Sequence, residues 1–300
     1  MSVPDLLTLP DHPTTDVDLQ GRTCLVTGAN TGIGRATAVR LARGGAHVLL
    51  ACRSAERTQP VLDEIAALPG ADAGTGTATF VPLDLADLDA VRTTAAEVLD
   101  RLGPDGRLDL LVNNAGVAGA KGVTAQGFEL TFGVGHLGHF LLTTLLLDKL
   151  VASAPARVVN LSSKAHFGAK GIDFEALRQP TRSPAGLVEY QVAKLCNVLF
   201  TIELARRLPA DADVTTCAVH PGVIGSDIWR QVPWPIRPAM TLFMGSVDTG
   251  ATGVLRGALD PDLTGTTGTY LDRGRPKAPS AVATPDLAAQ LWKQSEIWVE

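Results

Sequence analysis

The chain has 300 residues, of which 45% are hydrophobic and 19% are charged, and its formal net charge at pH 7 is −5. This length allows one large domain or two small ones, and this composition can fill a hydrophobic core, which excludes a disordered or collagen-like chain. The negative net charge gives no electrostatic basis for holding nucleic acid.

Strands and helices are predicted to alternate along the chain. Short apolar runs rich in β-branched residues predict seven strands, at 23–27, 47–52, 78–81, 108–112, 157–161, 214–219 and 268–271. Segments with helical spacing lie at 33–43, 55–68, 88–102, 124–150, 188–208, 246–259 and 285–298. This alternation predicts an α/β fold, a doubly wound parallel sheet of the Rossmann type with helices on both faces.

No linker divides the chain, so we expect one dinucleotide-binding domain over 19–300, preceded by an extended arm over 1–18. The segment 223–245 is rich in large apolar residues and prolines, and we expect it to form a lid over the substrate. Two interpretations of its apolar residues are equally good: they contact a lipophilic substrate, or they form a small core within the lid itself.

Three features bear on membranes and location. The longest apolar stretch, 137–150, is too short and too polar to cross about 30 Å of hydrocarbon, so we expect no membrane span. The first 13 residues lack a secretory signal, and the four cysteines form no CxxC pair, which favours a cytoplasmic protein with reduced thiols. Arg outnumbers Lys and Ala is abundant, which favours a bacterial source with a GC-rich genome.

A glycine-rich segment, Thr27–Gly34, follows the first predicted strand and opens the first helix. Glycines in this context let the backbone approach a pyrophosphate, and the helix N-terminus offers free N–H groups and a positive dipole end. The alternative is a turn that merely needs glycine. The residues expected to bind cofactor here are Gly28, Asn30, Thr31, Gly32, Ile33 and Gly34.

The end of the second strand bears on the choice of cofactor. A carboxylate there binds the ribose 2′-OH of NAD, whereas a basic residue pairs with the 2′-phosphate of NADP. The residues present are Arg53 and Ser54, which favours NADP(H), although an exposed Arg at a helix start is the alternative. Asp84 and Leu85 end the third strand and suit an adenine pocket, although Asp84 could instead cap the next helix.

Tyr190 and Lys194 stand four residues apart in a predicted helix, so both project from one face. A phenol is a poor proton carrier at pH 7, and a neighbouring ammonium favours the phenolate. The pair therefore suits general acid–base chemistry, and a core Tyr beside a solvated Lys is the alternative.

Taken together, these motifs resemble the short-chain dehydrogenase/reductase family over about 19–222. The resemblance rests on Thr27–Gly34, on Asn113–Gly116 after the fourth strand, on Ser162–Ser163 after the fifth, on Tyr190 with Lys194, and on Pro221–Gly222 after the sixth. The strings Gly28–Gly34, Ala51–Arg53, His136–Phe140 and His220–Gly222 look like the retinol dehydrogenase-like branch, whose members commonly use NADP(H).

The resemblance implies roles for individual residues. Tyr190 would be the general acid/base, Lys194 would bind the nicotinamide ribose and lower the Tyr190 pKa, and Ser163 would orient the substrate carbonyl. Further cofactor-binding residues implied are Asn114, Ala115, Gly116, Pro221, Gly222, Val223 and Ser226.

One position departs from the family pattern. The family's catalytic Asn precedes the His-Leu-Gly-His-Phe string, and Gly135 stands there instead. In the family this Asn supports a helix kink and a water that links the Lys to solvent. Gly135 keeps the backbone carbonyl and tolerates a kink, so we expect a water at that carbonyl to maintain a slower proton relay.

The sequence thus predicts an NADP(H)-dependent oxidoreductase that moves a hydride between nicotinamide and a carbonyl or secondary alcohol of a small, lipophilic substrate. The alternative is a chain that binds NADPH but serves as a non-redox scaffold or biosynthetic partner, for which Gly135 is the supporting feature. The six histidines show no metal-ligand spacing, so we expect no metal. The sequence leaves the oligomeric state undecided. A homo-oligomer is one alternative, because the helices at 124–150 and 188–208 often form dimer surfaces in the family that this chain resembles.

Overall fold

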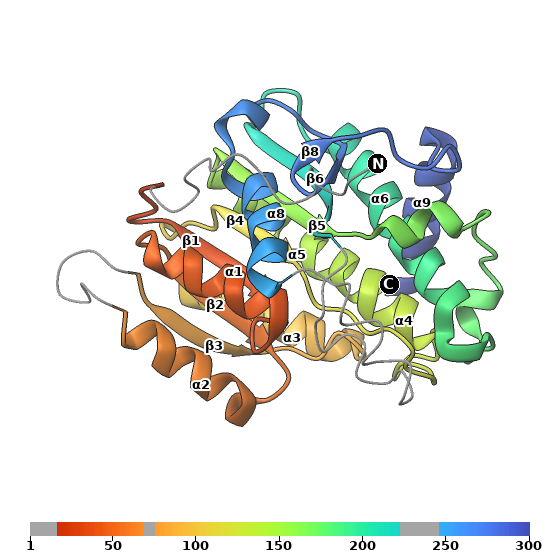
Figure 1. Ribbon diagram of the computed structural model, residues 1–300, viewed down its shortest axis with the longest axis horizontal. Helices are drawn as coiled ribbons and strands as arrows, with labels where there is room; N and C mark the ends of the chain where they lie inside the picture. Colours follow the sequence, from red (N-terminus) through yellow and green to blue (C-terminus); the bar gives the residue numbers. More distant parts are fainter. Residues whose placement is uncertain (1–16, 69–75, 223–245) are drawn as a thin grey trace, which may run out of the picture.

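The computed structural model describes residues 17–68, 76–222 and 246–300. The predicted lid at 223–245 and all but the last two residues of the predicted arm lie outside these ranges. Within them, eight strands form one sheet in the order β3-β2-β1-β4-β5-β6-β7-β8 (Figure 1). The strands are β1 Thr23–Thr27, β2 His47–Cys52, β3 Ala78–Pro82, β4 Leu110–Asn113, β5 Ala156–Leu161, β6 Val214–His220, β7 Thr269–Asp272 and β8 Arg275–Pro276.

The first seven strands pair in parallel, as the sequence predicts, whereas β8 pairs antiparallel with β7. Strand β8 was not predicted from the sequence, because it is only two residues long and contains Pro276. It folds back through a two-residue turn in which Arg273 and Gly274 both have positive φ, at 55° and 79°. A turn with two positive φ values matches the twist of a tight hairpin.

The helices fall within two residues of their predicted ends, with one exception. They are α1 Gly32–Arg43, α2 Ala55–Ala66, α3 Leu88–Leu102, α4 Leu130–Phe132, α5 Gly138–Ala152, α6 Leu187–Arg207, α8 Val247–Leu259 and α9 Pro285–Val299. The exception is the helix predicted over 124–150.

That helix begins six residues late and is interrupted. Residues 124–128 form a turn, in which Thr124 N donates to the carbonyl oxygen of Phe128 and Phe128 N donates to the Thr124 hydroxyl. The Glu129 carboxylate accepts a hydrogen bond from Phe132 N and so caps α4. A π-helical turn, η1 (Gly133–Leu137), then separates α4 from α5.

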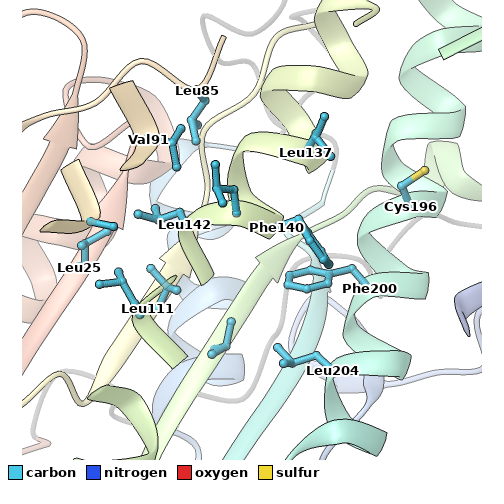
Figure 2. Packing of buried hydrophobic residues seen from close by; sticks show 14 of the residues in the cluster. Leu25, Leu85, Val91, Leu111, Leu137, Phe140, Leu142, Cys196, Phe200 and Leu204 are labelled. Carbon is cyan, nitrogen blue, oxygen red and sulfur yellow. The ribbon is translucent and has the colours of Figure 1, made fainter. Parts of the chain in front are cut away.

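Alternating strand residues pack against helices on opposite faces of the sheet. Leu25 and Leu111 face a core built with Phe140 of α5 and Phe200 of α6 (Figure 2). Cys24 and Val26 belong to a second core on the opposite face, where α1 and α8 lie side by side (Figure 1). These buried contacts fix α5 and α6 against the sheet, and α6 carries Tyr190 and Lys194.

One stretch in the described part of the chain, Leu130–Ala152, is long and apolar enough to cross a membrane by length and composition alone. It has a mean hydropathy of 1.5, and 72% of it is buried inside the fold. In this structure the stretch consists of α4, η1 and α5, and α5 packs against β4 and β5 of the sheet.

Candidate active site

A cleft of about 520 Å³ opens along the carboxyl edge of the sheet, where residues following six consecutive strands of the chain meet. This edge is where open α/β sheets bind ligands. Val223 and Ser226 lie outside the described residues. All the other residues predicted for the site line the cleft: Gly28, Asn30, Thr31, Gly32, Ile33, Gly34, Arg53, Ser54, Asp84, Leu85, Asn114, Ala115, Gly116, Ser163, Tyr190, Lys194, Pro221 and Gly222.

The glycine-rich loop is shaped by close approach of backbone atoms. A Cβ atom on Gly34 would lie 2.4 Å from the carbonyl oxygen of Gly28 and 2.4 Å from Asn114 Nδ2, so no side chain fits there. Gly28 has a φ of 65°, which favours glycine. Helix α1 begins at Gly32 inside this loop and directs its N-terminal N–H groups to the cleft, which fits a pyrophosphate.

The loop after β4 is tied to the end of β1. The Thr27 hydroxyl accepts hydrogen bonds from the backbone N–H groups of Asn114 and Ala115, each at 2.9 Å. The Asn114 side chain donates back to the carbonyl oxygen of Thr27 at 2.7 Å. These bonds hold the loop over the centre of the cleft. Thr27 belongs to the glycine-rich motif, and the sequence alone predicted no role for its hydroxyl.

Two exposed guanidinium groups lie where β2 ends. Arg53 follows the strand directly, and Arg57 lies in the first turn of α2, whose N-cap is Ser54. The Ser54 hydroxyl accepts a hydrogen bond from Arg57 N at 3.2 Å. Arg57 was not among the predicted site residues, although its spacing of four from Arg53 next to a helix start was a usable signal.

Asp84 lies in the cleft wall, and its carboxylate accepts a hydrogen bond from Ala86 N at 2.9 Å. The N-cap of α3 is Asp87, whose side chain accepts from Asp89 N. The alternative role considered for Asp84, as the cap of the next helix, is therefore wrong.

Ser163, Tyr190 and Lys194 converge beyond the end of β5. Ser163 and Tyr190 both line the cleft, the Ser163 side chain lowers the pKa of the Tyr190 phenol, and Lys194 Nζ lies 5.7 Å from the centre of the Tyr190 ring. Lys194 Nζ donates to the carbonyl oxygen of Leu161 at 2.9 Å. Asn197, one turn further along α6, donates to the same oxygen at 2.8 Å and was missed by the sequence analysis.

Burial dominates the electrostatics of this group. It raises the pKa of Tyr190 above its usual value, with the hydrogen bond to Ser163 opposing, and it lowers the pKa of Lys194 to about 8. The sequence led us to expect that Lys194 would instead lower the Tyr190 pKa. In the structure Tyr190 is 7% exposed, so loss of solvation outweighs the hydrogen bond to Ser163, and the phenol is protonated at neutral pH.

Gly135 lies in the middle of the π-helical turn η1, where the sequence led us to expect a kink. A Cβ atom there would meet only the Cβ of Ala193, at 3.8 Å, so the position has room for a side chain. The carbonyl oxygen of Gly135 is 3.3 Å from Nδ1 of His139.

Fold and site together define a dinucleotide-binding oxidoreductase with a Ser-Tyr-Lys group. The family model described as short chain dehydrogenase matches residues 22–177. The chain therefore belongs to the short-chain dehydrogenase family, whose members use nicotinamide cofactors.

Curated relatives agree with the resemblance to the retinol dehydrogenase-like branch. Human retinol dehydrogenase 13 is 40% identical over 287 residues, covering 92% of this chain and 84% of the relative. Mouse retinol dehydrogenase 12 is 42% identical over 289 residues, covering 94% and 87%.

Solved structures show the same fold. An uncharacterised protein from Mycobacterium paratuberculosis superposes with a TM-score of 0.72 at 32% identity, covering 94% of this chain and 95% of the other. A protein from Beutenbergia cavernae, described as an NAD(P)-dependent gluconate 5-dehydrogenase with NADP bound at low occupancy, has a TM-score of 0.66 at 28% identity, covering 85% and 96%. Both the fold class and the family expected from the sequence are thus confirmed.

Proposed function

We propose that this protein is an NADP(H)-dependent oxidoreductase that interconverts a carbonyl group and a secondary alcohol on a small, lipophilic substrate, working as a reductase in cells. The observation that carries the proposal is a single cleft that joins two guanidinium groups to a Ser-Tyr-Lys group. Arg53 follows β2 and Ser163 follows β5. These two strands are three positions apart in the sheet, and neighbouring strands are separated by about 4.8 Å. This span suits an extended dinucleotide.

The residues of the cleft fit each part of NADP(H). The backbone of Gly28–Gly34 would hold the pyrophosphate, and Arg53 and Arg57 would pair with the 2′-phosphate. Asp84 and Leu85 would border the adenine. The remaining cofactor residues would lie beside the nicotinamide and its ribose: Asn114, Ala115, Gly116, Tyr190, Lys194, Pro221, Gly222, Val223 and Ser226.

When bound, the nicotinamide supplies or accepts the hydride. In reduction, the Tyr190 hydroxyl donates a proton to the substrate oxygen, and the Ser163 hydroxyl holds that oxygen by a second hydrogen bond as negative charge develops on it. Because burial raises the pKa of Tyr190, the phenol carries its proton at neutral pH, as the donor in this direction requires. The Lys194 ammonium, 5.7 Å from the ring, favours the phenolate that remains.

The substrate side of the cleft supports a lipophilic substrate. Apolar side chains line it after β4, in α4 and η1, and at the start of α6: Val117, Ala118, Ala120, Leu130, Val134 and Leu187. Such walls exclude water and take up apolar surface, while Ser163 and Tyr190 supply the polar contacts that orient a carbonyl.

A cytoplasmic location is part of the same proposal. All four cysteines, Cys24, Cys52, Cys196 and Cys217, are free and buried. Unpaired thiols are the usual state in a reducing compartment.

The test is NADPH consumption by the purified protein against a panel of aldehydes and ketones of increasing apolar size. We expect turnover that requires both the carbonyl compound and NADPH and that rises with apolar size. NADPH binding without turnover on any carbonyl would favour the non-redox alternative.

A further inference from the structure

One buried titratable group beside the cleft has no part in the proposed chemistry: the imidazole of His139, in the first turn of α5. The residue is 2% exposed, and its two ring nitrogens reach two different elements of the site. Nε2 lies 2.8 Å from the hydroxyl oxygen of Thr27, and Nδ1 lies 3.3 Å from the carbonyl oxygen of Gly135. His139 therefore connects the end of β1 with the π-helical turn.

Counting protons at Thr27 sets the direction of the first contact. A hydroxyl has one hydrogen and two lone pairs. The N–H groups of Asn114 and Ala115 donate to the Thr27 oxygen at 2.9 Å each and occupy both lone pairs. An N–H on His139 Nε2 would find no lone pair there, so Nε2 must be the acceptor and Thr27 the donor. The other acceptor in reach of Thr27, the carbonyl oxygen of Val112, is farther away at 3.4 Å.

The tautomer of His139 follows from this direction. Burial lowers the pKa of His139 to about 3, so the ring is neutral at physiological pH and carries one proton. Since Nε2 accepts, the proton is on Nδ1, which donates to the carbonyl oxygen of Gly135. A directed chain of hydrogen bonds thus runs from the amides of Asn114 and Ala115 through Thr27 and His139 to Gly135.

We propose that His139 is a positioning residue for the cofactor site. Its Nε2 accepts a hydrogen bond from the Thr27 hydroxyl, and this orients both lone pairs of the Thr27 oxygen toward the loop Asn114–Gly116. This inference rests on the proposed function, in which that loop borders the nicotinamide ribose. Without the imidazole, the Thr27 hydroxyl is left with the longer contact to Val112, and the loop loses a well-directed acceptor for its two amides.

Three substitutions separate this role from simple packing. His139→Gln can place a carbonyl oxygen near the position of Nε2 and keep the contact with Thr27. His139→Asn can place an amide N–H near Nδ1 and keep only the contact with Gly135. His139→Leu removes both contacts. The measurement is the dissociation constant of NADPH by titration, together with the melting temperature of each variant.

We expect His139→Gln to bind NADPH within about twofold of the unsubstituted protein, and His139→Asn and His139→Leu to bind about three- to tenfold more weakly, the range of one lost hydrogen bond. Thr27→Val should weaken binding similarly. In the double variant with Thr27→Val, His139→Leu should cost little further affinity, because the hydroxyl that it orients is already gone.

A second His–Thr contact gives a matched control. His47 Nδ1 lies 2.6 Å from the Thr77 hydroxyl oxygen, next to β3 and away from the residues that line the cleft. His47→Leu should leave NADPH affinity unchanged.

The outcomes are distinguishable. Equal weakening by His139→Gln, His139→Asn and His139→Leu, or additive losses in the double variant, would reduce His139 to a packing residue and overturn the inference while leaving the proposed function intact. Absence of NADPH binding by the unsubstituted protein would overturn the proposed function and this inference with it.

Discussion

Arg53 and Arg57 are the side chains that set the cofactor preference in the proposed function. A charge-assisted contact with the 2′-phosphate is worth about 1.5 to 3 kcal/mol, which is about tenfold to a hundredfold in affinity. We expect Arg53→Ala to weaken NADPH binding by about this factor and to leave NADH binding nearly unchanged, as measured by titration with each cofactor. Arg57→Ala should act in the same direction.

Arg101→Ala is the matched control, since Arg101 pairs with Glu97 on the exposed face of α3 and does not line the cleft. It should change neither dissociation constant. Equal constants for NADPH and NADH in the unsubstituted protein would remove the basis for an NADP(H) preference.

Tyr190 carries the proton in the proposed mechanism. Tyr190→Phe keeps the ring and removes the hydroxyl, so we expect turnover to be lost and NADPH affinity to stay nearly constant, because the hydroxyl acts in the transition state. Steady-state kinetics and a cofactor titration on the same preparation check both halves. A variant that retained most of its kcat would show that another group donates the proton.

Lys194 is kept in the interior at a cost in stability. Burial lowers its pKa from the usual 10.5 to about 8, and a depression of this size corresponds to about 3 kcal/mol against the folded state. Because the folded-state pKa is the lower one, the cost is fully present below pH 8 and disappears as the pH rises toward 10.5.

We therefore expect Lys194→Met to lose activity but to melt a few degrees higher than the unsubstituted protein at pH 7, with a smaller gap at pH 9.5. Lys149→Met is the control, because the Lys149 ammonium donates to the carbonyl oxygens of Gly103 and Pro104 at the molecular surface. It should give no gain at pH 7. A lower melting temperature for Lys194→Met at pH 7 would mean that its hydrogen bond to Leu161 outweighs the burial cost.

At the scale of secondary structure, the π-helical turn η1 offers a test of the missing Asn. Gly135 has room for a Cβ atom, whereas a Cβ on Gly133 in the same turn would lie 2.2 Å from Cγ2 of Thr124. We expect Gly135→Asn to fold with an unchanged or slightly higher melting temperature and to raise kcat modestly, since Asn is a better helix former than Gly and restores the amide.

Gly133→Asn, the same substitution two residues away, should lower the melting temperature clearly because of its clash with Thr124. A Gly135→Asn variant that is stable but slower would show that the chain relies on another route for proton supply, and the imidazole of His139 on the Gly135 carbonyl would then be the first group to examine.

The elements that the sequence predicted well are those with a clear pattern of apolar residues. β1 and β2 match their predicted ranges, because continuous apolar runs bounded by turn residues identify buried parallel strands. The start of α4 and the turn η1 were not predictable by the same means. Their boundaries depend on the Glu129 cap and on how the helix packs. Apolar residues continue at helical spacing through the start of α4 and through η1, so the sequence pattern marks neither boundary.

At the scale of the whole molecule, the sequence identified the residues that belong to local motifs, and the fold brought together those within the described ranges. Asn197 and His139 were missed for a physical reason: each acts through a contact with a carbonyl or a hydroxyl that is distant in the chain. Arg57 is different, because its spacing from Arg53 was visible in the sequence. His139 is 112 positions from Thr27, and no local pattern encodes that contact.

The membrane question also belongs to this scale. Composition favoured no span, yet Leu130–Ala152 passes the test of length and apolarity. Most of its apolar side chains are buried in the core with residues of the sheet and of α6, and Leu145 is exposed.

The most direct test of the central claim is isotope transfer from NADPH deuterated at the transferable position of the nicotinamide. The protein is incubated with this cofactor and the best carbonyl compound of the panel, and the product is examined by mass spectrometry. We expect an alcohol that carries the deuterium on its carbinol carbon, and no such product with Tyr190→Phe. An alcohol without the label, or NADPH bound tightly with the carbonyl compound recovered unchanged, would contradict the claim that this chain transfers a hydride.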